Sequence, residues 1–242
     1  MEKPKKTIHG LLIMVAVLLA AILFILFSPL FALRELRVEG NQRISEAEIL
    51  HITGLYTNPN FFTFNTRQAR SRLLENVYID YVTFLRIPPN RITVTTGERF
   101  LSGYIQLMEH QYLYIDEQGR VLELRAYRAY PLPIIAGLHF PHFHLGEILQ
   151  VENPEVFRII ATYTRLLHYH QIAQEVRMYV SDPTNIRMRL DNMEVYLGDT
   201  QDANEKILTL STILQTWTAA GEAKGFLDLR NPGRHAVFRA LT

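Results

Sequence analysis

The strongest hydrophobic pattern lies near the start of the chain, where residues 11–33 are apolar except for one Ser-Pro pair. Roughly 20 apolar helical residues cross the hydrocarbon core of a bilayer, so this stretch predicts a transmembrane helix. Three lysines precede it, and basic residues tend to stay on the cytoplasmic side. The pattern therefore predicts a cytoplasmic tail at 1–10, a single-pass type II anchor at 11–33 and an extracytoplasmic body.

A cleaved signal peptide shows the same order of basic and apolar residues. Its apolar region is shorter, about 7 to 15 residues, and ends before a small-residue cleavage site. Here the apolar block at 11–27 is unbroken, and the SPLFAL segment at 28–33 offers no good small-x-small pair. We therefore favour an anchor that is retained.

Behind the anchor, residues 33–39 alternate apolar and charged side chains, which is the period of a half-buried strand. The segment at 44–49, ISEAEI, combines a Ser-x-x-Glu capping box with a hydrophobic staple, and so predicts a short helix over 46–52. Similar patterns predict one more helix and two strands, at 66–75, 77–86 and 92–96. Gly97 follows directly, and a glycine inside a strand pattern often marks a β-bulge.

Residues 100–242 form a second predicted α+β unit, in which strands are separated by turns rich in Asp, Asn and Gly. One predicted helix starts at Asn153-Pro154-Glu155, with proline at its first position, and another follows Asp202. The predicted strands lie at 101–107, 111–115, 120–124, 175–180, 185–190, 193–197, 226–229 and 235–239.

Composition and charge narrow the possible functions. The chain has no cysteine, which excludes disulfides, thiol nucleophiles and cysteine-ligated metals. It carries 25 basic and 24 acidic residues, and the basic residues are scattered. Binding of nucleic acid normally needs a clustered basic face, so we predict no nucleic-acid partner.

The motifs of anchored cell-wall enzymes and of zinc proteases are missing. The sequence contains no Ser-x-x-Lys, His-Glu-x-x-His or Gly-x-Ser-x-Gly pattern. His139, His142 and His144 are the nearest approach to a metal cluster, but their proline-broken run favours a surface loop over a zinc site. We predict a protein that is not an enzyme and has no catalytic residue, metal, cofactor or small-molecule substrate.

Several motifs, taken in their order and spacing, resemble one known family. The first group is LRELRVEGNQRISEAEIL at 33–50, FF-x-F at 61–64 and IPPNRITVTTGER at 87–99. These resemble a POTRA module, a small α+β fold with a three-stranded sheet covered by two helices. Further motifs, with Lys206 among them, are YIDEQGRVLEL at 114–124, LPIIAG at 132–137, VYLGD at 195–199 and FLDLRNPGRHAVFR at 226–239. With one apolar anchor in front, the chain resembles the bacterial cell-division proteins FtsQ and DivIB.

This resemblance implies an α+β architecture with a POTRA domain at 34–99 and a β-rich FtsQ/DivIB-type domain at 100–242. It also implies enrichment at the division septum of the cytoplasmic membrane, binding to the bitopic proteins FtsB (DivIC) and FtsL, and regulation of septal peptidoglycan synthesis. The alternative is a POTRA-bearing chaperone or scaffold of envelope protein export.

The final predicted strand, 235–239, is the candidate binding element, because an edge strand offers unpaired backbone groups to another chain. A fully covered closing strand is the alternative; the resemblance favours the edge, since relatives bind their coiled-coil partner there. An edge of the POTRA sheet is a second predicted surface. The predicted partner-binding residues are Leu227, Asp228, Leu229, Arg230, Ala236, Val237, Phe238 and Arg239.

Overall fold

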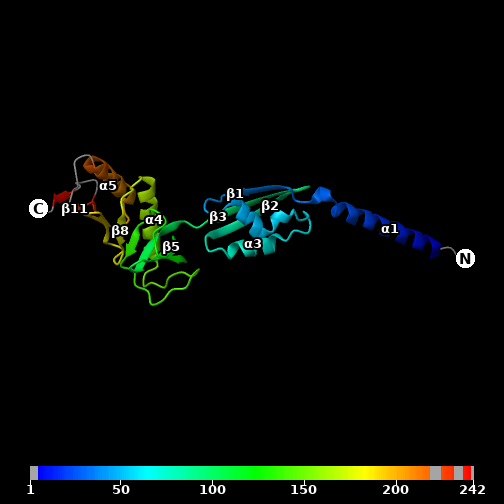
Figure 1. The fold of residues 1–242 in the computed structure, drawn as a ribbon, viewed down its shortest axis with the longest axis horizontal. Coiled ribbons are helices and arrows are strands. Elements are labelled where there is room, and N and C mark those ends of the chain that lie inside the picture. Colours follow the sequence, from blue (N-terminus) through cyan, green and yellow to red (C-terminus); the bar gives the residue numbers. More distant parts are fainter. Residues whose placement is uncertain (1–4, 219–224, 232–236, 241–242) are drawn as a thin grey trace. The chain divides into compact units, whose positions relative to one another are not determined.

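The computed structural model describes residues 5–218, 225–231 and 237–240. The chain divides into two compact units, Met1–Glu98 and Arg99–Thr242. Both contain a β-sheet together with helices, as the predicted α+β class requires (Figure 1).

The apolar stretch at the start forms helix α1 (Lys5–Leu26) and a short 3-10 turn, η1 (Pro29–Phe31). The helix ends earlier than predicted because Ser28 caps η1, with its Oγ accepting the Leu30 N–H at 3.3 Å. Leu33, predicted as the last residue of the anchor, is instead fully buried in the core of the first unit. Within the described part of the chain, no helix combines the length and apolarity needed to cross a membrane.

The rest of the first unit has the strand-helix-helix-strand-strand order that the sequence predicts. Its sheet has the order β1-β3-β2, in which β1 pairs parallel to β3 and β2 pairs antiparallel to it. Helices and sheet share one apolar core. The elements are β1 (Glu35–Glu39), α2 (Glu46–Thr53), η2 (Leu55–Thr57), α3 (Thr66–Leu74), β2 (Ile79–Ile87) and β3 (Arg91–Glu98).

The two helix starts follow the predicted capping chemistry. Ser45 Oγ accepts the N–H of Glu48 at 3.2 Å, and Asn65 Oδ1 accepts the N–H of Gln68 at 3.1 Å. Each cap satisfies one of the amides that the first helical turn leaves without an intrahelical acceptor. These starts of α2 and α3 are therefore confirmed.

Gly97 has a different role from the predicted one. The register of β2 and β3 does shift here, but the extra residue is Asp80 on β2, between the pairs Ile79–Glu98 and Tyr81–Gly97. The ring of Tyr81 lies over Gly97, and a Cβ on this glycine would be only 2.0 Å from Tyr81 Cε1. Glycine is thus used for close approach of an aromatic ring opposite the bulge.

The second unit is built on one sheet with the strand order β12-β11-β10-β9-β8-β7-β4-β5-β6. Three of its neighbouring pairs are parallel, namely β4–β7, β7–β8 and β10–β11, and the others are antiparallel. The strands are β4 (Leu101–Met108), β5 (Gln111–Asp116), β6 (Val121–Arg125), β7 (Ile134–Ala136), β8 (Val176–Tyr179), β9 (Ile186–Leu190), β10 (Met193–Gly198), β11 (Gly225–Asp228) and β12 (Val237–Ala240).

Helices α4 (Glu155–Tyr169) and α5 (Ala203–Thr218) pack with this sheet around a single apolar core (Figure 1). Helix α4 supplies the larger share, with Phe157, Ile160 and Tyr163 all buried. Pro154 was predicted as the first helical residue of α4, but it is the N-cap, one position earlier. A proline fits there because the first amides of a helix have no intrahelical partner.

Two tyrosines hold the loop 126–133, which joins β6 to β7. Tyr104 and Tyr114 are buried, and each hydroxyl donates to a loop carbonyl and accepts a loop amide. The best of these contacts joins the Ala129 N–H to the Tyr114 hydroxyl at 2.7 Å. Burial raises the pKa of both phenols above the usual value.

Candidate functional site

The candidate binding strand, β12, is the terminal strand of the nine-stranded sheet. It pairs antiparallel with β11 in the register Val237–Asp228, Phe238–Leu227 and Arg239–Phe226. Among the described residues, no strand pairs with its other edge. Backbone N–H and C=O groups on that side can therefore accept an added strand.

The opposite end of the sheet, β6, is partly covered by the chain itself. Val121 donates its N–H to Glu147 O at 2.8 Å and accepts the Gly146 N–H at 2.7 Å. Leu149 N–H also donates to Gly119 O at 2.9 Å. The loop that contains residues 146–149 thus occupies the start of that edge. No comparable cover of β12 is found among the residues that the structure describes.

The predicted residues on and after β11 divide into buried and exposed positions. Leu227 and Leu229 are fully buried in the core, and the Leu229 N–H donates to Tyr196 O at 2.8 Å. Asp228 and Arg230 lie at the surface, where Arg230 Nε donates to Asp228 Oδ1 at 2.9 Å. This hydrogen bond raises the pKa of Arg230, whose guanidinium also lies 5.9 Å from the centre of the Tyr196 ring. The leucines thus fix the strand, and the side chains of Asp228 and Arg230 are partly exposed.

For the remaining predicted residues, the structure describes the backbone of three and leaves one undescribed. Val237, Phe238 and Arg239 lie on β12, next to β11, as the backbone pairing shows. Ala236 lies outside the described residues. The two predicted groups therefore come together on neighbouring strands, and the contribution of each side chain to binding stays a prediction.

Sequence reasoning missed how the turn after β10 is held. Lys206 is buried, and its Nζ donates to the Asp199 carbonyl at 3.0 Å and to Asp199 Oδ1 at 3.4 Å. The Tyr163 hydroxyl donates to the same carbonyl at 2.8 Å. In the sequence, Lys206 was noted only as one of the motif residues that resemble FtsQ and DivIB. Its role could have been suspected because a lysine inside an apolar helix face is rarely buried without an acceptor.

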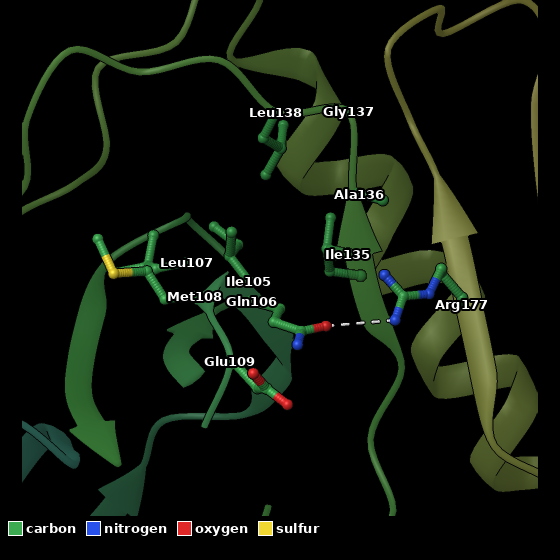
Figure 2. A pocket seen from close by; sticks show the side chains of 10 residues that line it. All are labelled: Ile105, Gln106, Leu107, Met108, Glu109, Ile135, Ala136, Gly137, Leu138 and Arg177. Carbon is green, nitrogen blue, oxygen red and sulfur yellow. Dashed lines mark hydrogen bonds between the residues drawn. The ribbon is translucent and has the colours of Figure 1, made fainter. Parts of the chain in front are cut away.

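A hollow of about 400 Å³ opens where β4 and β7 separate after only two paired positions (Figure 2). Gln106 Oε1 accepts a hydrogen bond from Arg177 Nη2 at 3.2 Å across this gap. The lining is mostly aliphatic and consists of Ile105, Gln106, Leu107, Met108, Glu109, Ile135, Ala136, Gly137, Leu138 and Arg177. It contains no arrangement of nucleophile and base.

The three histidines of the HFPHFH segment, His139, His142 and His144, are exposed on the loop between β7 and α4. His144 lies 3.5 Å from a carboxylate oxygen of Glu147, and the rings of His142 and His144 are 5.6 Å apart. In the described parts of the chain, no group of three or more His, Cys, Asp or Glu residues is arranged to hold a metal ion.

Comparison with known proteins assigns each unit to a described domain type. Residues 31–99 match the FtsQ-type POTRA domain, and residues 103–230 match the C-terminal domain of the cell-division protein FtsQ/DivIB. Fold and matches together define a bacterial cell-division protein that carries a POTRA module.

Similar proteins extend this assignment over most of the chain. DivIB of Clostridium tetani is 23% identical over 213 residues, which cover 87% of this chain and 80% of that protein. FtsQ of Corynebacterium glutamicum is 22% identical over 215 residues, covering 87% and 91%. FtsQ of Koribacter versatilis is 23% identical over 215 residues, covering 83% of this chain and 60% of the relative. The chain belongs to the FtsQ/DivIB family of cell-division proteins.

Proposed function

We propose that this protein is a non-catalytic scaffold of the division machinery, with a POTRA domain at 34–99 and a β domain at 100–242. It binds bitopic partners of the FtsB/DivIC and FtsL type at the septum and helps to regulate septal peptidoglycan synthesis. Membership of the family supports a division role. The observation that carries the proposed mechanism is the position of β12 at the end of the sheet, with no further strand paired to it among the described residues.

Strand addition explains how such an edge can bind a partner without catalysing a reaction. A partner segment that lies along β12 forms main-chain hydrogen bonds, while side chains beside the edge select the segment. Asp228 and Arg230 sit next to β12 and offer one charge of each sign. Confinement of both partners to one membrane raises their effective concentration, so a modest affinity is sufficient.

Membrane attachment through the apolar N-terminal stretch is part of this proposal. The large apolar side chains of α1 from Leu11 onward are exposed on all sides, which suits a lipid environment and not a protein core. Residues 11–26 are the apolar part of α1 and span about 24 Å at 1.5 Å per residue, less than the roughly 30 Å of a bilayer core. Apolar residues beyond Leu26 must therefore complete the span.

The POTRA sheet supplies the second proposed surface, and β2 is its better edge. Strand β1 is short and places Glu35, Arg37 and Glu39 on the solvent face. Strand β2 is longer and exposes Tyr81 and Leu85 on the same face. Charged, short edges resist strand addition, whereas a long edge with apolar neighbours favours it.

The β12 proposal is tested by two consecutive proline variants, Val237→Pro and Phe238→Pro. In an antiparallel pair, successive residues point their N–H groups alternately toward the neighbouring strand and away from it. One of the two prolines therefore removes a bond to β11, and the other removes a donor on the open edge.

The full chain in detergent is titrated with the ectodomain of the FtsB/DivIC-type partner. The outward-facing proline is expected to weaken binding about tenfold while leaving the thermal unfolding midpoint unchanged. A partner carbonyl left without its donor costs about 1–3 kcal/mol, and about 1.4 kcal/mol corresponds to tenfold. Arg239→Lys keeps the backbone intact and serves as the control. Wild-type affinity in both proline variants would refute strand addition at β12.

The export-scaffold alternative predicts a different distribution in cells. A fluorescent fusion expressed during depletion of the native protein is expected at mid-cell, with rescue of filamentation. Uniform envelope labelling would instead favour the export role, and turnover of peptidoglycan by the purified chain would contradict a non-catalytic scaffold.

A further inference from the structure

The loop 58–62 is attached to the segment that leaves α1. Asn60 and Ala32 form an antiparallel bridge, and the Phe61 N–H donates to Phe31 O at 2.7 Å. Asn60 Nδ2 also donates to Leu26 O at 2.9 Å, which satisfies a carbonyl at the end of the helix. Two segments distant in sequence are thus joined where the apolar stretch meets the POTRA domain.

The FF-x-F motif divides its aromatic rings between the core and the surface at this place. Phe61 and Phe64 are buried in the POTRA core, whereas Phe62 keeps 48% of its surface exposed. Phe27 and Leu30, which follow α1, are 63% and 61% exposed. Phe62 lies against Phe31, with ring centres 5.0 Å apart. We call Phe27, Leu30 and Phe62 the junction patch.

We propose that the junction patch inserts into the lipid surface, so that the POTRA domain itself completes the apolar span that α1 leaves short. This inference rests on the membrane attachment proposed above. The patch is continuous along the chain with the exposed apolar face of α1, and its bridge to loop 58–62 carries Phe62 to the same place. Aromatic side chains favour the boundary between acyl chains and headgroups.

Lipid suits this patch better than a second protein surface, because α1 is too short for the bilayer core and the missing apolar length lies where the patch is. The apolar part of α1 is about 6 Å shorter than a bilayer core, and a short span is commonly corrected by neighbouring apolar residues or by thinning of the bilayer. Phe27 follows the last residue of α1 directly and Leu30 lies in the adjoining turn η1, so the proposal places both at that depth. Phe62 then extends the apolar surface onto the folded domain.

The absence of cysteine allows single labels to be introduced without background. The full chain is reconstituted in vesicles of phosphatidylethanolamine and phosphatidylglycerol with an environment-sensitive fluorophore on Thr63→Cys, next to Phe62. Quenching by lipids brominated along the acyl chain measures depth. Leu74→Cys is the matched control, because Leu74 is an apolar surface residue of the same domain with 40% exposure. Leu18→Cys reports on α1.

The label at 63 is expected to be quenched by the lipid bromines, and the label at 74 is expected to stay in water. Adding Phe62→Asp to the Thr63 variant should reduce quenching roughly three- to tenfold, because a half-exposed phenylalanine loses its favourable transfer into apolar surroundings. Equal, water-like signals at 63 and 74, with Leu18 quenched, would overturn the patch and leave the anchor standing. An unquenched Leu18 would instead remove the anchor. Self-quenching at 63 that rises with protein density would assign the patch to a second copy of the chain and also overturn the lipid contact.

Discussion

Replacing Glu98 with glutamine tests how the POTRA loop before α2 is held. The Glu98 carboxylate accepts three consecutive backbone amides, from Gln42 at 2.7 Å, Arg43 at 2.9 Å and Ile44 at 3.1 Å. Its second oxygen also lies 2.9 Å from the Arg43 N–H. The last residue of β3 thus clasps a loop that is more than fifty positions earlier in the sequence.

The size of the free-energy loss expected for Glu98→Gln follows from the negative charge of the carboxylate that accepts these hydrogen bonds. Hydrogen bonds to a charged group contribute about 1.5–3 kcal/mol each, and those to a neutral group about 0.5–1.5 kcal/mol. Glutamine keeps one acceptor oxygen but turns a donor NH₂ group toward amides that need an acceptor. After allowance for partial solvent exposure, we expect a loss of about 2 kcal/mol, which corresponds to roughly 30-fold more frequent opening of the loop.

Amide hydrogen exchange of the full chain, read by mass spectrometry, measures this opening at residues 42–44 directly. Glu39→Gln is the control, because Glu39 pairs with Arg37 at 2.8 Å on the surface, where their side chains are 44% and 73% exposed. Such pairs contribute a few tenths of a kcal/mol. If Glu98→Gln leaves exchange at 42–44 as slow as in the control, the proposed clasp is refuted.

Three further predictions concern the β domain. Gly119 has φ +79°, and a Cβ there would lie 2.4 Å from the Phe157 ring, so Gly119→Ala should lower the free energy of unfolding by about 3 kcal/mol or more in urea titrations; wild-type stability would contradict this packing. Lys206→Met leaves Asp199 without its ammonium donor and should cost about 2 kcal/mol in the same assay; an unchanged midpoint would deny Lys206 this role. Burial raises the pKa of Tyr163 above 10, so the unfolded chain loses its phenolic proton first and stability should fall as pH rises above 10. Tyr163→Phe should flatten the alkaline part of a stability-against-pH curve, and an equally steep curve would rule out this phenol as the cause.

Local structure was largely predictable because short-range chemistry determines it. The cap at Ser45 and the strand that ends near Leu190 lie where hydrophobic period and turn residues place them. The end of α1 was predicted too late, because apolarity continues through Leu33 while the backbone turns at Ser28 and Pro29. Hydrophobicity alone does not report that change of backbone direction.

The periodicity of the sequence does not predict which strands pair with each other in the sheet. The three-residue strand β7 lies between β4 and β8 and joins the two halves of the sheet, yet no periodic pattern at 134–136 predicts a strand there. Its parallel pairings depend on contacts between segments far apart in the chain. For the candidate site, the strands β11 and β12 were predicted close to their observed bounds. That Leu227 and Leu229 are interior residues depends on which side of the sheet α5 covers, and this needed the structure.

The position of β12 has a consequence for the timing of assembly. It is the last of the nine strands in chain order, and its only strand partner among the described residues is β11, itself the second to last. Under the proposed function β12 is the recruitment surface, so a body that is still being translocated behind its cytoplasmic amino end has not yet completed that surface. Partners that bind by strand addition at β12 would then join only those copies whose translocation and folding are complete.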